Sequence, residues 1–330
     1  MDREMPTAVL DARRDLSGSV TAALEVLRAR SLVAIPSETV YGLAGDALAP
    51  EAVAKIFEVK ERPHFDPLIV HIAGDQWLSK LVQPGSAESL LVRKLIARFW
   101  PGPLTVLLPK TNLVPDIVTA GSHLVAIRMP SHPVFAEVLH RFGRPLAAPS
   151  ANRFGKVSPT RSEDVLEELR GKIPLILDAG PTNFGLESTI VRAVEHRIEI
   201  LRPGAITEEM LGEVAPTSEP VVGTGIVTPG QAARHYAPEK RVSLFDKQDR
   251  ADHSTNSALL CWGPAHDKER FLEVRSLSER CDLREAAQRL FQLIREADRM
   301  EKVEQIFIEP VPEHGLGKAI MNRVRRAMRA

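Results

Sequence analysis

The sequence predicts a mixed α/β fold, in which a twisted sheet is followed by a second, smaller α/β domain. Short apolar runs typical of buried strands alternate with segments of helical period. Several successive strands have only short connections, which favours a mixed sheet over a purely parallel one. Near residue 215 prolines and glycines replace the periodic segments. We therefore expect a domain over residues 1–214, a linker over 215–240 and a small α/β domain over 241–330.

Residues 32–72 form the stretch around which the first domain is organised. The apolar run 32–35 predicts a buried strand, and Pro36 ends it. Ser37, Glu38 and Thr39 follow at the carboxyl end of that strand, the edge at which ligands bind in open α/β sheets. Pro50 suits the first position of a helix. That helix leads into Lys60 and a basic turn before a second apolar strand at 68–72.

The other elements follow from the same periodicities. The remaining expected elements of the first domain are a helix around 20–27 capped by Ser17 or Ser19, a helix at 90–99, strands at 104–108 and 125–127, a helix near 134–139, a strand and turn at 146–152, a helix from Ser162, a strand at 175–177, and adjacent strands at 187–193 and 197–201. For the second domain we expect strands at 242–245, 258–262 and 305–308, a helix over 283–300 and a last helix from Leu316.

Composition excludes several classes of protein. The 330 residues include 44% hydrophobic and 26% charged residues, an ordinary globular balance, and the formal net charge is zero. No global attraction to nucleic acid or membrane is therefore expected. The two cysteines have no metal-ligand spacing, and neither a signal core nor a membrane-length apolar run is visible. These features predict a cytoplasmic protein with no membrane segment.

Common catalytic signatures are missing from the sequence. We find no phosphate-loop motif, dinucleotide fingerprint, nucleophile elbow or paired-histidine zinc motif. The segment from Gly315 to Lys318 is a fragment of a phosphate loop, and a glycine-rich helix start is the better interpretation. The basic last helix is interpreted as a solvated face in preference to a partner contact. The sequence therefore gives no support to triad hydrolysis or zinc catalysis.

Hydroxyl and basic side chains recur at the ends of the apolar runs. They are Ser37, Thr39, Lys60, Arg62, Thr119, Arg128, Ser150, Asn152, Ser158, Ser188, Thr189 and Arg202. Taken singly, each is more often a turn or cap residue, and a Lys-x-Arg after a helix is more often a solvated helix end. Together they predict a pocket with several donors and at least four positive charges but no evident nucleophile. Such a pocket suits phosphoryl or nucleotidyl transfer, which depends on positioning and electrostatic stabilisation.

A set of motifs in a fixed order resembles one known family. The motifs are IPSETVYGL, KERPHFDPLIVHI, WPGPLTVLL, VAIRMPSHPVF, APSANRFGKVSPT, LESTIV and ILRPG. This order resembles that of the threonylcarbamoyl-AMP synthases, which have the YrdC-type fold. RHYAP and EHGLGKAIMNRVRRA resemble the long form with an appended C-terminal domain. The resemblance covers nearly the whole chain from about residue 15 and implies a twisted sheet with a large basic cavity.

The resemblance also implies an activity. The family condenses L-threonine, bicarbonate and ATP into threonylcarbamoyl-adenylate and releases pyrophosphate, with Mg²⁺ accompanying ATP. The product passes to the machinery that modifies a tRNA adenosine beside the anticodon, and weak tRNA binding is a further expectation. No protein nucleophile is required, because the carbamate of threonine attacks the α-phosphate itself. We expect the linker and C-terminal domain to gate the cavity.

Site residues are carried over position by position, with no resident metal ligands among them. The resemblance assigns Lys60, Arg62, Ser150 and Asn152 to a tetrad around the phosphates, Ser37, His71, Arg128, Ser150 and Ser188 to threonine, and Arg62, Asp66, Thr119, Ser158, Arg202 and Tyr236 to ATP. Arg128 would hold the amino acid carboxylate, and Tyr236 would act as a flap over the nucleotide.

Two positions depart from the family pattern. Ser37 replaces a frequent threonine and keeps its hydroxyl, so little change is expected. Asp66 replaces a common asparagine and brings a negative charge toward ATP unless Arg62, Mg²⁺ or protonation compensates. One methyl group distinguishes threonine from serine and contributes only about 1–3 kcal/mol, so some use of serine is expected.

Two competing functions remain for comparison. A nucleic-acid binding module is disfavoured by the neutral net charge and by the 5% aromatic content. Carbamoyl transfer, as in hydrogenase-maturation proteins that share the YrdC-type fold, would require zinc-finger and acylphosphatase modules that the chain lacks. The sequence therefore favours the adenylate-forming enzyme.

Overall fold

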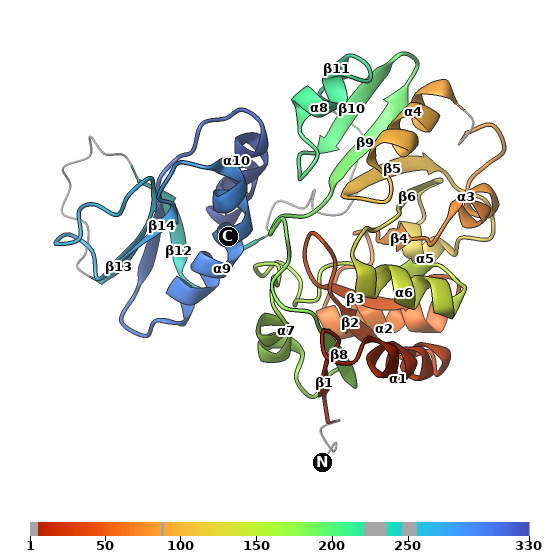
Figure 1. Cartoon of the computed structure of the whole chain (residues 1–330), viewed down its shortest axis with the longest axis horizontal. Coiled ribbons are helices and arrows are strands. Elements are labelled where there is room, and N and C mark those ends of the chain that lie inside the picture. Colours follow the sequence, from red (N-terminus) through yellow and green to blue (C-terminus); the bar gives the residue numbers. More distant parts are fainter. Residues whose placement is uncertain (1–5, 87–88, 221–235, 246–255, 330) are drawn as a thin grey trace. The chain divides into compact units, whose positions relative to one another are not determined.

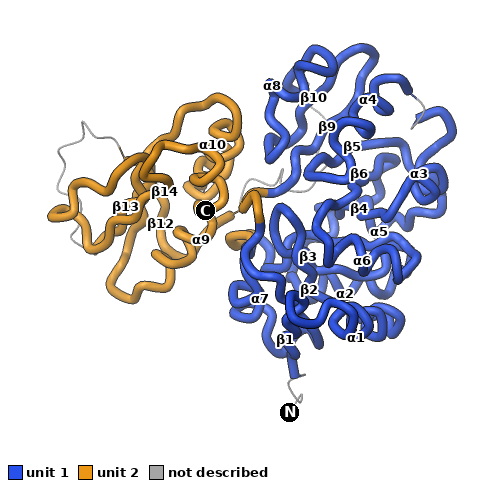
Figure 2. Tube along the Cα trace, viewed as in Figure 1, with its two compact units in different colours: residues 1–154, 159–182, 187–232 blue, residues 155–158, 183–186, 233–330 orange. Residues whose placement is uncertain are grey.

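A computed structural model of the chain divides into two compact units (Figures 1 and 2). The structure describes residues 6–86, 89–220, 236–245 and 256–329. The first unit comprises residues 1–154, 159–182 and 187–232, and the second comprises residues 155–158, 183–186 and 233–330. Two short loops of the N-terminal region thus belong to the second unit. The change in composition near residue 215 had placed the division between residues 214 and 241, in the linker.

The first unit is built on an eleven-stranded sheet. In spatial order its strands are β1 (Ala8–Asp11), β8 (Leu175–Asp178), β2 (Val33–Ile35), β3 (Gly42–Asp46), β7 (Leu146–Ala147), β4 (Ile69–His71), β6 (Leu124–Arg128), β5 (Leu104–Pro109), β9 (Thr189–Val194), β10 (Arg197–Arg202) and β11 (Thr217–Ser218). The sheet contains both parallel pairs, such as β4 with β6, and antiparallel pairs, such as β5 with β6. The predicted mixed sheet is confirmed.

Helices pack against both faces of this sheet. They are α1 (Leu16–Arg28), α2 (Pro50–Lys60), α3 (Asp75–Leu81), α4 (Leu90–Phe99), α5 (Asp116–Thr119), α6 (Pro133–Phe142), α7 (Ser162–Leu169) and α8 (Glu208–Gly212). Because strand side chains alternate between faces, Val33 and Ile35 of β2 pack with α1 and α6, whereas Ala34 packs on the other side. That other side carries the larger core, to which α2, α4 and α7 contribute.

Local sequence signals explain most of the predicted helices. Pro50 begins α2, as expected, and Glu61 ends it in the left-handed region with φ 54°. The start of α1 differs from the prediction: its N-cap is Asp15, whose carboxylate accepts from the Gly18 amide at 2.8 Å. Ser17 lies inside the helix. Aspartate is as good an N-cap residue as serine, so the sequence around 15–19 offered several equivalent caps.

Seven elements of the described residues were not expected from the sequence: β1, β3, α3, α5, α8, β11 and, in the second unit, β14 (Glu273–Ser278). Strand β3 is the clearest case, since it lies in a segment interpreted as loop and contains Gly42 and Gly45. Glycine weakens a strand, but β3 is held on both sides by antiparallel pairing with β2 and β7. Tertiary pairing therefore outweighs local propensity here.

The second unit is a smaller α/β domain, as predicted. Its four strands are all parallel, in the order β12 (Arg241–Leu244), β15 (Gln305–Ile308), β13 (Ser257–Trp262) and β14. Helices α9 (Leu283–Arg299) and α10 (Leu316–Ala327) complete it. Most of the expected linker, residues 221–235, lies outside the described residues, and β11 occupies part of its start. No helix in the described part of the chain is long and apolar enough to cross a membrane.

Candidate active site

A row of polar side chains lies on one face of the sheet beside a small apolar cluster. The cluster consists of strand residues Ile69, Leu107, Ala126, Ile190 and Leu201. His71, Thr105 and Arg128 lie two positions along their strands from cluster members and therefore share this face. The strand register places Arg128 opposite both His71 and Thr105. We call this surface the site face.

The loop after β2 folds back on itself through Ser37. The Ser37 hydroxyl donates to the Val40 carbonyl at 2.6 Å and accepts from the amides of Thr39 and Val40. It also lies 2.9 Å from the Thr39 hydroxyl. Ser37 is thus a turn residue, as its residue type suggested, and the turn it forms presents Glu38 and Thr39 to the site face.

Glu38 and Arg128 form a buried ion pair at this turn. Their side chains are only 6% and 4% exposed, and Nη2 of Arg128 lies 2.5 Å from Oε1 of Glu38. Arg128 also donates to the Thr39 hydroxyl and the Gly102 carbonyl. Burial opposes ionisation of Glu38, but the charge and hydrogen bond of Arg128 outweigh it, so the pKa of Glu38 lies below its usual value. The arginine expected to hold a substrate carboxylate therefore already has an internal carboxylate partner.

Two histidines stand beside this pair. His71 is buried, stacks on Phe135 with ring centroids 4.9 Å apart, and its pKa is lowered to about 3 by burial and by the charge of Arg128. Burial likewise lowers the pKa of His132, and the carboxylate of Glu38 partly opposes that shift. Both imidazoles are therefore neutral at physiological pH.

Lys60 brings the predicted tetrad together. Its ammonium group donates to the carbonyls of Ser150 at 2.6 Å and Asn152 at 2.5 Å, across 90 and 92 residues of sequence. Its carbonyl accepts from the Phe154 amide, so Lys60 holds the turn from both sides. The side chain is 1% exposed, and burial, with the charge of Arg62, lowers the pKa of Lys60 to about 7. Lys60 thus positions the turn after β7 as well as carrying charge.

Arg62 compensates the unexpected carboxylate of Asp66. Their closest side-chain atoms, Nη2 and Oδ2, are 2.9 Å apart, with exposures of 3% and 0%. Arg62 also donates to the carbonyls of Asp66 and Pro67 and lies over the Phe154 ring. Burial raises the pKa of Asp66, while the charges of Arg62, Lys60 and Arg202 act in the opposite direction. Arg62, Mg²⁺ or protonation could offset the negative charge of Asp66. The structure contains the first of these, the ion pair with Arg62.

Ser188 and Arg202 form a third group on the site face. Arg202 donates to both the carbonyl and the hydroxyl of Ser188, at 2.9 and 3.1 Å from Nη2. The Ser188 hydroxyl lies 2.8 Å from that of Thr105, the register partner of Arg128. At Gly204 a Cβ atom would fall 2.5–2.6 Å from backbone atoms of residues 187–189, so glycine is required there for close approach.

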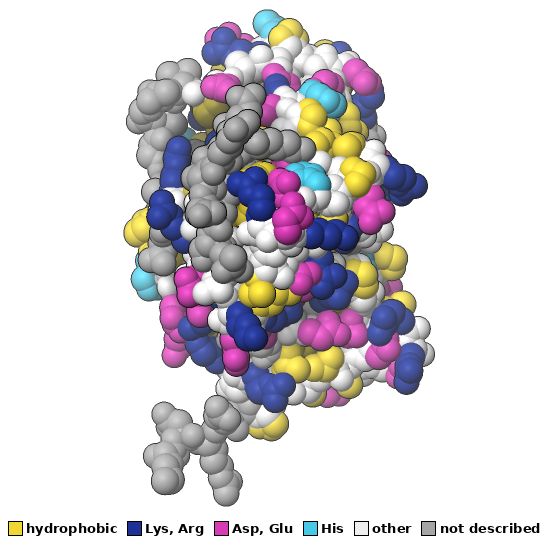
Figure 3. All heavy atoms as spheres, turned by 90° about the vertical axis from the view of Figure 1, so that its left-hand side faces the viewer, with side chains coloured by type: hydrophobic (Ala, Val, Ile, Leu, Met, Phe, Trp, Pro, Cys, Tyr) yellow, Lys and Arg dark blue, Asp and Glu magenta, His cyan; other side chains and the backbone are white. Residues whose placement is uncertain are grey.

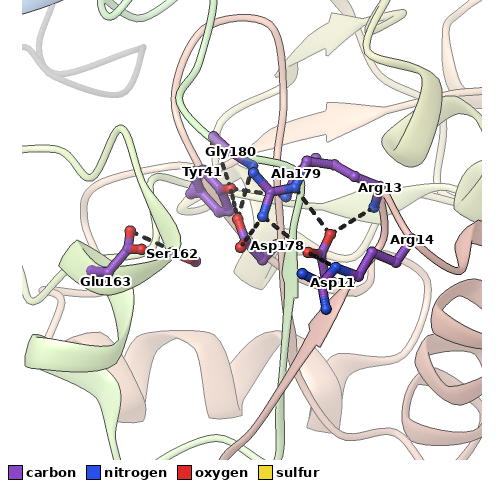
Figure 4. Close-up of polar contacts among 9 residues, drawn as sticks. All are labelled: Asp11, Arg13, Arg14, Tyr41, Ser162, Glu163, Asp178, Ala179 and Gly180. Atoms are coloured by element: carbon purple, nitrogen blue, oxygen red, sulfur yellow. Dashed lines mark hydrogen bonds and ion pairs between the residues drawn. The ribbon is translucent and has the colours of Figure 1, made fainter.

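A buried tyrosine anchors the loop that carries Ser188 (Figure 4). Tyr41 donates from its hydroxyl to the Gly180 carbonyl at 2.7 Å and accepts from the Ala179 amide at 3.2 Å. Asp178, at the end of β8, is paired with Arg13 at 3.2 Å. Burial raises the pKa of Tyr41, so its hydroxyl remains a donor at any physiological pH. The Tyr41 carbonyl accepts from the Ala151 amide, which couples this anchor to the Ser150–Asn152 turn.

Three of the residues predicted to contact ATP have the following surroundings in the structure. Thr119 is buried at the end of α5, where its hydroxyl donates to the Ser122 carbonyl at 2.8 Å. Ser158 and Tyr236 belong to the second unit. There Tyr236 is 1% exposed, stacks on Phe291 with centroids 5.5 Å apart, and has the guanidinium of Arg323 5.1 Å from its ring centre. Tyr236 is therefore packed into the small domain.

Sequence reasoning missed three contributors to the site face: Glu38 as a partner of Arg128, Thr105 and His132. Glu38 and Thr105 lie within motifs that had been singled out, but their charge and polarity gave no indication of which neighbours they contact. Among the described residues no group of three histidine, cysteine or acidic side chains is arranged to hold a metal ion. On the face shown in Figure 3, described basic and acidic side chains are interspersed, in keeping with the zero formal net charge.

This arrangement suits the binding of small anions and zwitterions. Lys60, Arg62, Arg128 and Arg202 are all buried, and two carboxylates, Glu38 and Asp66, pair with two of them. The hydroxyls of Ser37, Thr105 and Ser188 lie among these charges. Fixed donors of this kind stabilise developing negative charge without a protein nucleophile.

Comparison with known proteins identifies the family. Residues 25–204 match the family described as telomere recombination, and residues 206–328 match the C-terminal domain of threonylcarbamoyl-AMP synthase. The threonylcarbamoyl-AMP synthase of Pyrococcus abyssi is 37% identical over 97% of both chains, and that of Bacillus subtilis is 37% identical over 93% of this chain and 92% of its own. The solved structure of P. abyssi Sua5 complexed with L-threonine aligns with a TM-score of 0.84 at 36% identity, over 98% of this chain and 97% of the other. The chain therefore belongs to the threonylcarbamoyl-AMP synthase family.

Proposed function

We propose that this protein is a nucleotidyltransferase that forms threonylcarbamoyl-AMP from L-threonine, bicarbonate and ATP and releases pyrophosphate. The observation that carries the proposal is the clamp by which Lys60 joins the Ser150–Asn152 turn to the basic turn after α2. It gathers cations and hydroxyl groups that lie far apart in sequence. The near full-length similarity to curated synthases supports the same conclusion.

The reaction follows two balanced steps. The amine of threonine adds to bicarbonate, giving a carbamate and water. A carbamate oxygen then attacks the α-phosphorus of ATP, a phosphorus–oxygen bond to the β-phosphate breaks, and pyrophosphate leaves. In this proposal the tetrad and Arg202 bind the phosphates, while Arg128 and its neighbours bind the amino acid. Thr119, Ser158 and Tyr236 remain assigned to ATP by the resemblance to the family alone.

Mg²⁺ enters this scheme as part of the substrate, in complex with ATP. A magnesium ion is commonly held by one or two carboxylates together with phosphate oxygens. Asp66 is the only carboxylate proposed on the ATP side, and its Oδ1 is buried without a hydrogen-bond partner in the described part of the chain. That oxygen fits a role beside the metal, which would offset phosphate charge when bound.

The product would then serve a transferase that modifies tRNA. The similarity to synthases of this name supports such a partner. The proposed protein is cytoplasmic and binds tRNA weakly. On the face shown in Figure 3 the described basic and acidic side chains are interspersed, which favours weak binding over a dedicated RNA-binding surface on that face.

Pyrophosphate release from ATP and Mg²⁺ tests the proposal, with threonine or bicarbonate omitted in turn. We expect release only when both are present, and its loss in Lys60→Ala and Arg62→Ala. Lys55→Ala is a matched control, because Lys55 lies on the same helix but is exposed. Release that is indifferent to threonine would mean a different acceptor, and tight tRNA binding without release would favour the binding module.

A further inference from the structure

Three buried polar atoms without hydrogen-bond partners in the described part of the chain converge near Arg128. They are Oε2 of Glu38, Nδ1 of His71 and Nδ1 of His132. The carboxylate of Glu38 is close enough to both imidazoles for its charge to influence the pKa of each. A buried polar atom that lacks a partner destabilises the folded state. Three in one place indicate a position prepared for a polar ligand.

The charges of this position match a zwitterion. Glu38 is ionised beside Arg128, whose hydrogen bond goes to Oε1, and the backbone amides of Glu38 and Ser131 also favour the charged form. Oε2 is buried and has no partner within hydrogen-bond geometry among the described residues. Of the five N–H donors of Arg128, three serve Glu38, Thr39 and Gly102. The pair as a whole is neutral and exposes an anionic acceptor beside a cationic donor. A ligand with both an ammonium and a carboxylate group satisfies both.

We propose that Oε2 of Glu38 accepts a hydrogen bond from the α-ammonium group of the amino acid substrate, while the remaining donors of Arg128 bind its α-carboxylate. This inference rests on the proposed function for the presence of an amino acid at the site. It assigns to Glu38 the selection of amino acids over hydroxy acids of the same shape. The neighbouring neutral imidazoles add polar contacts without adding a positive charge that would repel the ammonium group.

A purely structural role for Glu38 predicts a different outcome. If Glu38 only orients Arg128, any ligand with a carboxylate loses affinity equally when Glu38 is changed. If Glu38 contacts the ammonium group, only a ligand with that group loses affinity. The ratio of two dissociation constants therefore separates the roles. Suitable probes are L-threonine and 2,3-dihydroxybutanoate of matching stereochemistry, which carries a hydroxyl in place of the amine.

Isothermal titration calorimetry on the full chain measures this ratio. For the wild-type protein we expect L-threonine to bind at least about tenfold more tightly than 2,3-dihydroxybutanoate, since a charge-assisted hydrogen bond is lost with the amine. In Glu38→Gln the carboxamide keeps an acceptor for Arg128 but loses the charge, and we expect the ratio to fall toward one. Glu38→Asp keeps the charge and should retain part of the preference.

Glu199→Gln is the matched control. Glu199 is also buried and lies 2.5 Å from an arginine, Arg192, but on β10 within the pair β9–β10. We expect Glu199→Gln to leave the ratio unchanged. Circular dichroism and the unfolding midpoint check that each variant folds.

Each result decides the inference. A wild-type protein that binds the two probes equally overturns it without any variant, and so does a ratio that Glu38→Gln leaves unchanged. Either result leaves threonine-dependent pyrophosphate release, and thus the proposed function, intact. A wild-type protein that binds no amino acid overturns both. Should another amino acid bind in place of threonine, that amino acid and its hydroxy analogue give the same test of Glu38.

Discussion

Lys60 allows the sharpest test of the site, because burial and hydrogen bonding change its pKa in opposite directions. Burial lowers the pKa of Lys60 to about 7 from its ordinary value of 10.5. Two carbonyls, of Ser150 and Asn152, accept hydrogen bonds from the amine and favour its charged form. Replacement by methionine keeps the length of the side chain and removes both the donors and the titration.

The expected effect on stability depends on pH. Between pH 7 and 10.5 the unfolded chain binds more protons at Lys60 than the folded chain, so this residue makes stability rise with pH. From pH 7 to 9 the two pKa values give an increase of about 2 kcal/mol in the wild-type protein that Lys60→Met lacks. The stability difference between the two proteins should therefore widen by that amount. Loss of the two hydrogen bonds adds a difference of about 1–3 kcal/mol per carbonyl at every pH.

Urea unfolding at pH 7, 8 and 9 measures the difference. Lys55→Met is the matched control: Lys55 is exposed on the same helix and donates to one carbonyl, that of Arg30, at 2.9 Å. Its difference from wild type should stay constant over this range. The reasoning would be refuted if the difference in free energy of unfolding between wild type and Lys60→Met also stayed constant from pH 7 to 9. That result would mean that the two carbonyls keep Lys60 fully charged despite burial.

Three further perturbations follow from the site. Asp66→Asn removes the carboxylate proposed to lie beside Mg²⁺, so the KM for ATP should rise by about threefold to tenfold in initial-rate measurements; an unchanged KM would show that this carboxylate takes no part in binding Mg²⁺ and ATP. Tyr41→Phe removes the hydroxyl that anchors the β8–β9 loop and should lower the free energy of unfolding by about 1–3 kcal/mol in urea titrations, whereas an unaltered midpoint would contradict this anchoring role. Gly204→Ala places a Cβ 2.6 Å from the Ser188 backbone and should reduce kcat/KM by more than about tenfold. Gly212→Ala, where nothing lies within 4 Å, should leave kcat/KM unchanged, and equal activity of the two glycine variants would argue against a close packing requirement.

The sequence predicted the elements whose signals are local. Helix α9 and strand β15 occupy nearly the residues expected from periodicity, because an apolar stripe of one period fits only one regular structure. Strand β3 was missed because its glycines give no strand signal, and its two neighbours in the sheet come from elsewhere in the chain. The N-cap of α1 was misassigned because several polar residues there could serve.

The candidate site shows the same division. Residue type and position at the ends of apolar runs selected Lys60, Arg62, Arg128, Ser188 and Arg202 as candidates, and all five are buried in the structure. The residues that these side chains contact could not be predicted from the sequence. Each such residue is remote in sequence, or several nearby residues could make the same contact. The pairing of Arg128 with Glu38 spans 90 residues, and strands β3, β7 and β4 lie between β2 and β6 in the sheet.

The sequence by itself therefore determined the mixed α/β class, the presence of a small second domain and the choice of basic and hydroxyl residues as candidates for the site. These features follow from periodicity and residue chemistry, which act over a few neighbouring positions. Only the tertiary structure decided that Lys60 clamps a turn, that Arg62 offsets Asp66, that Glu38 pairs with Arg128, and that Tyr236 packs within the small domain. Ionisation and hydrogen bonding depend on burial and on distances of a few ångströms, and the folded chain sets both.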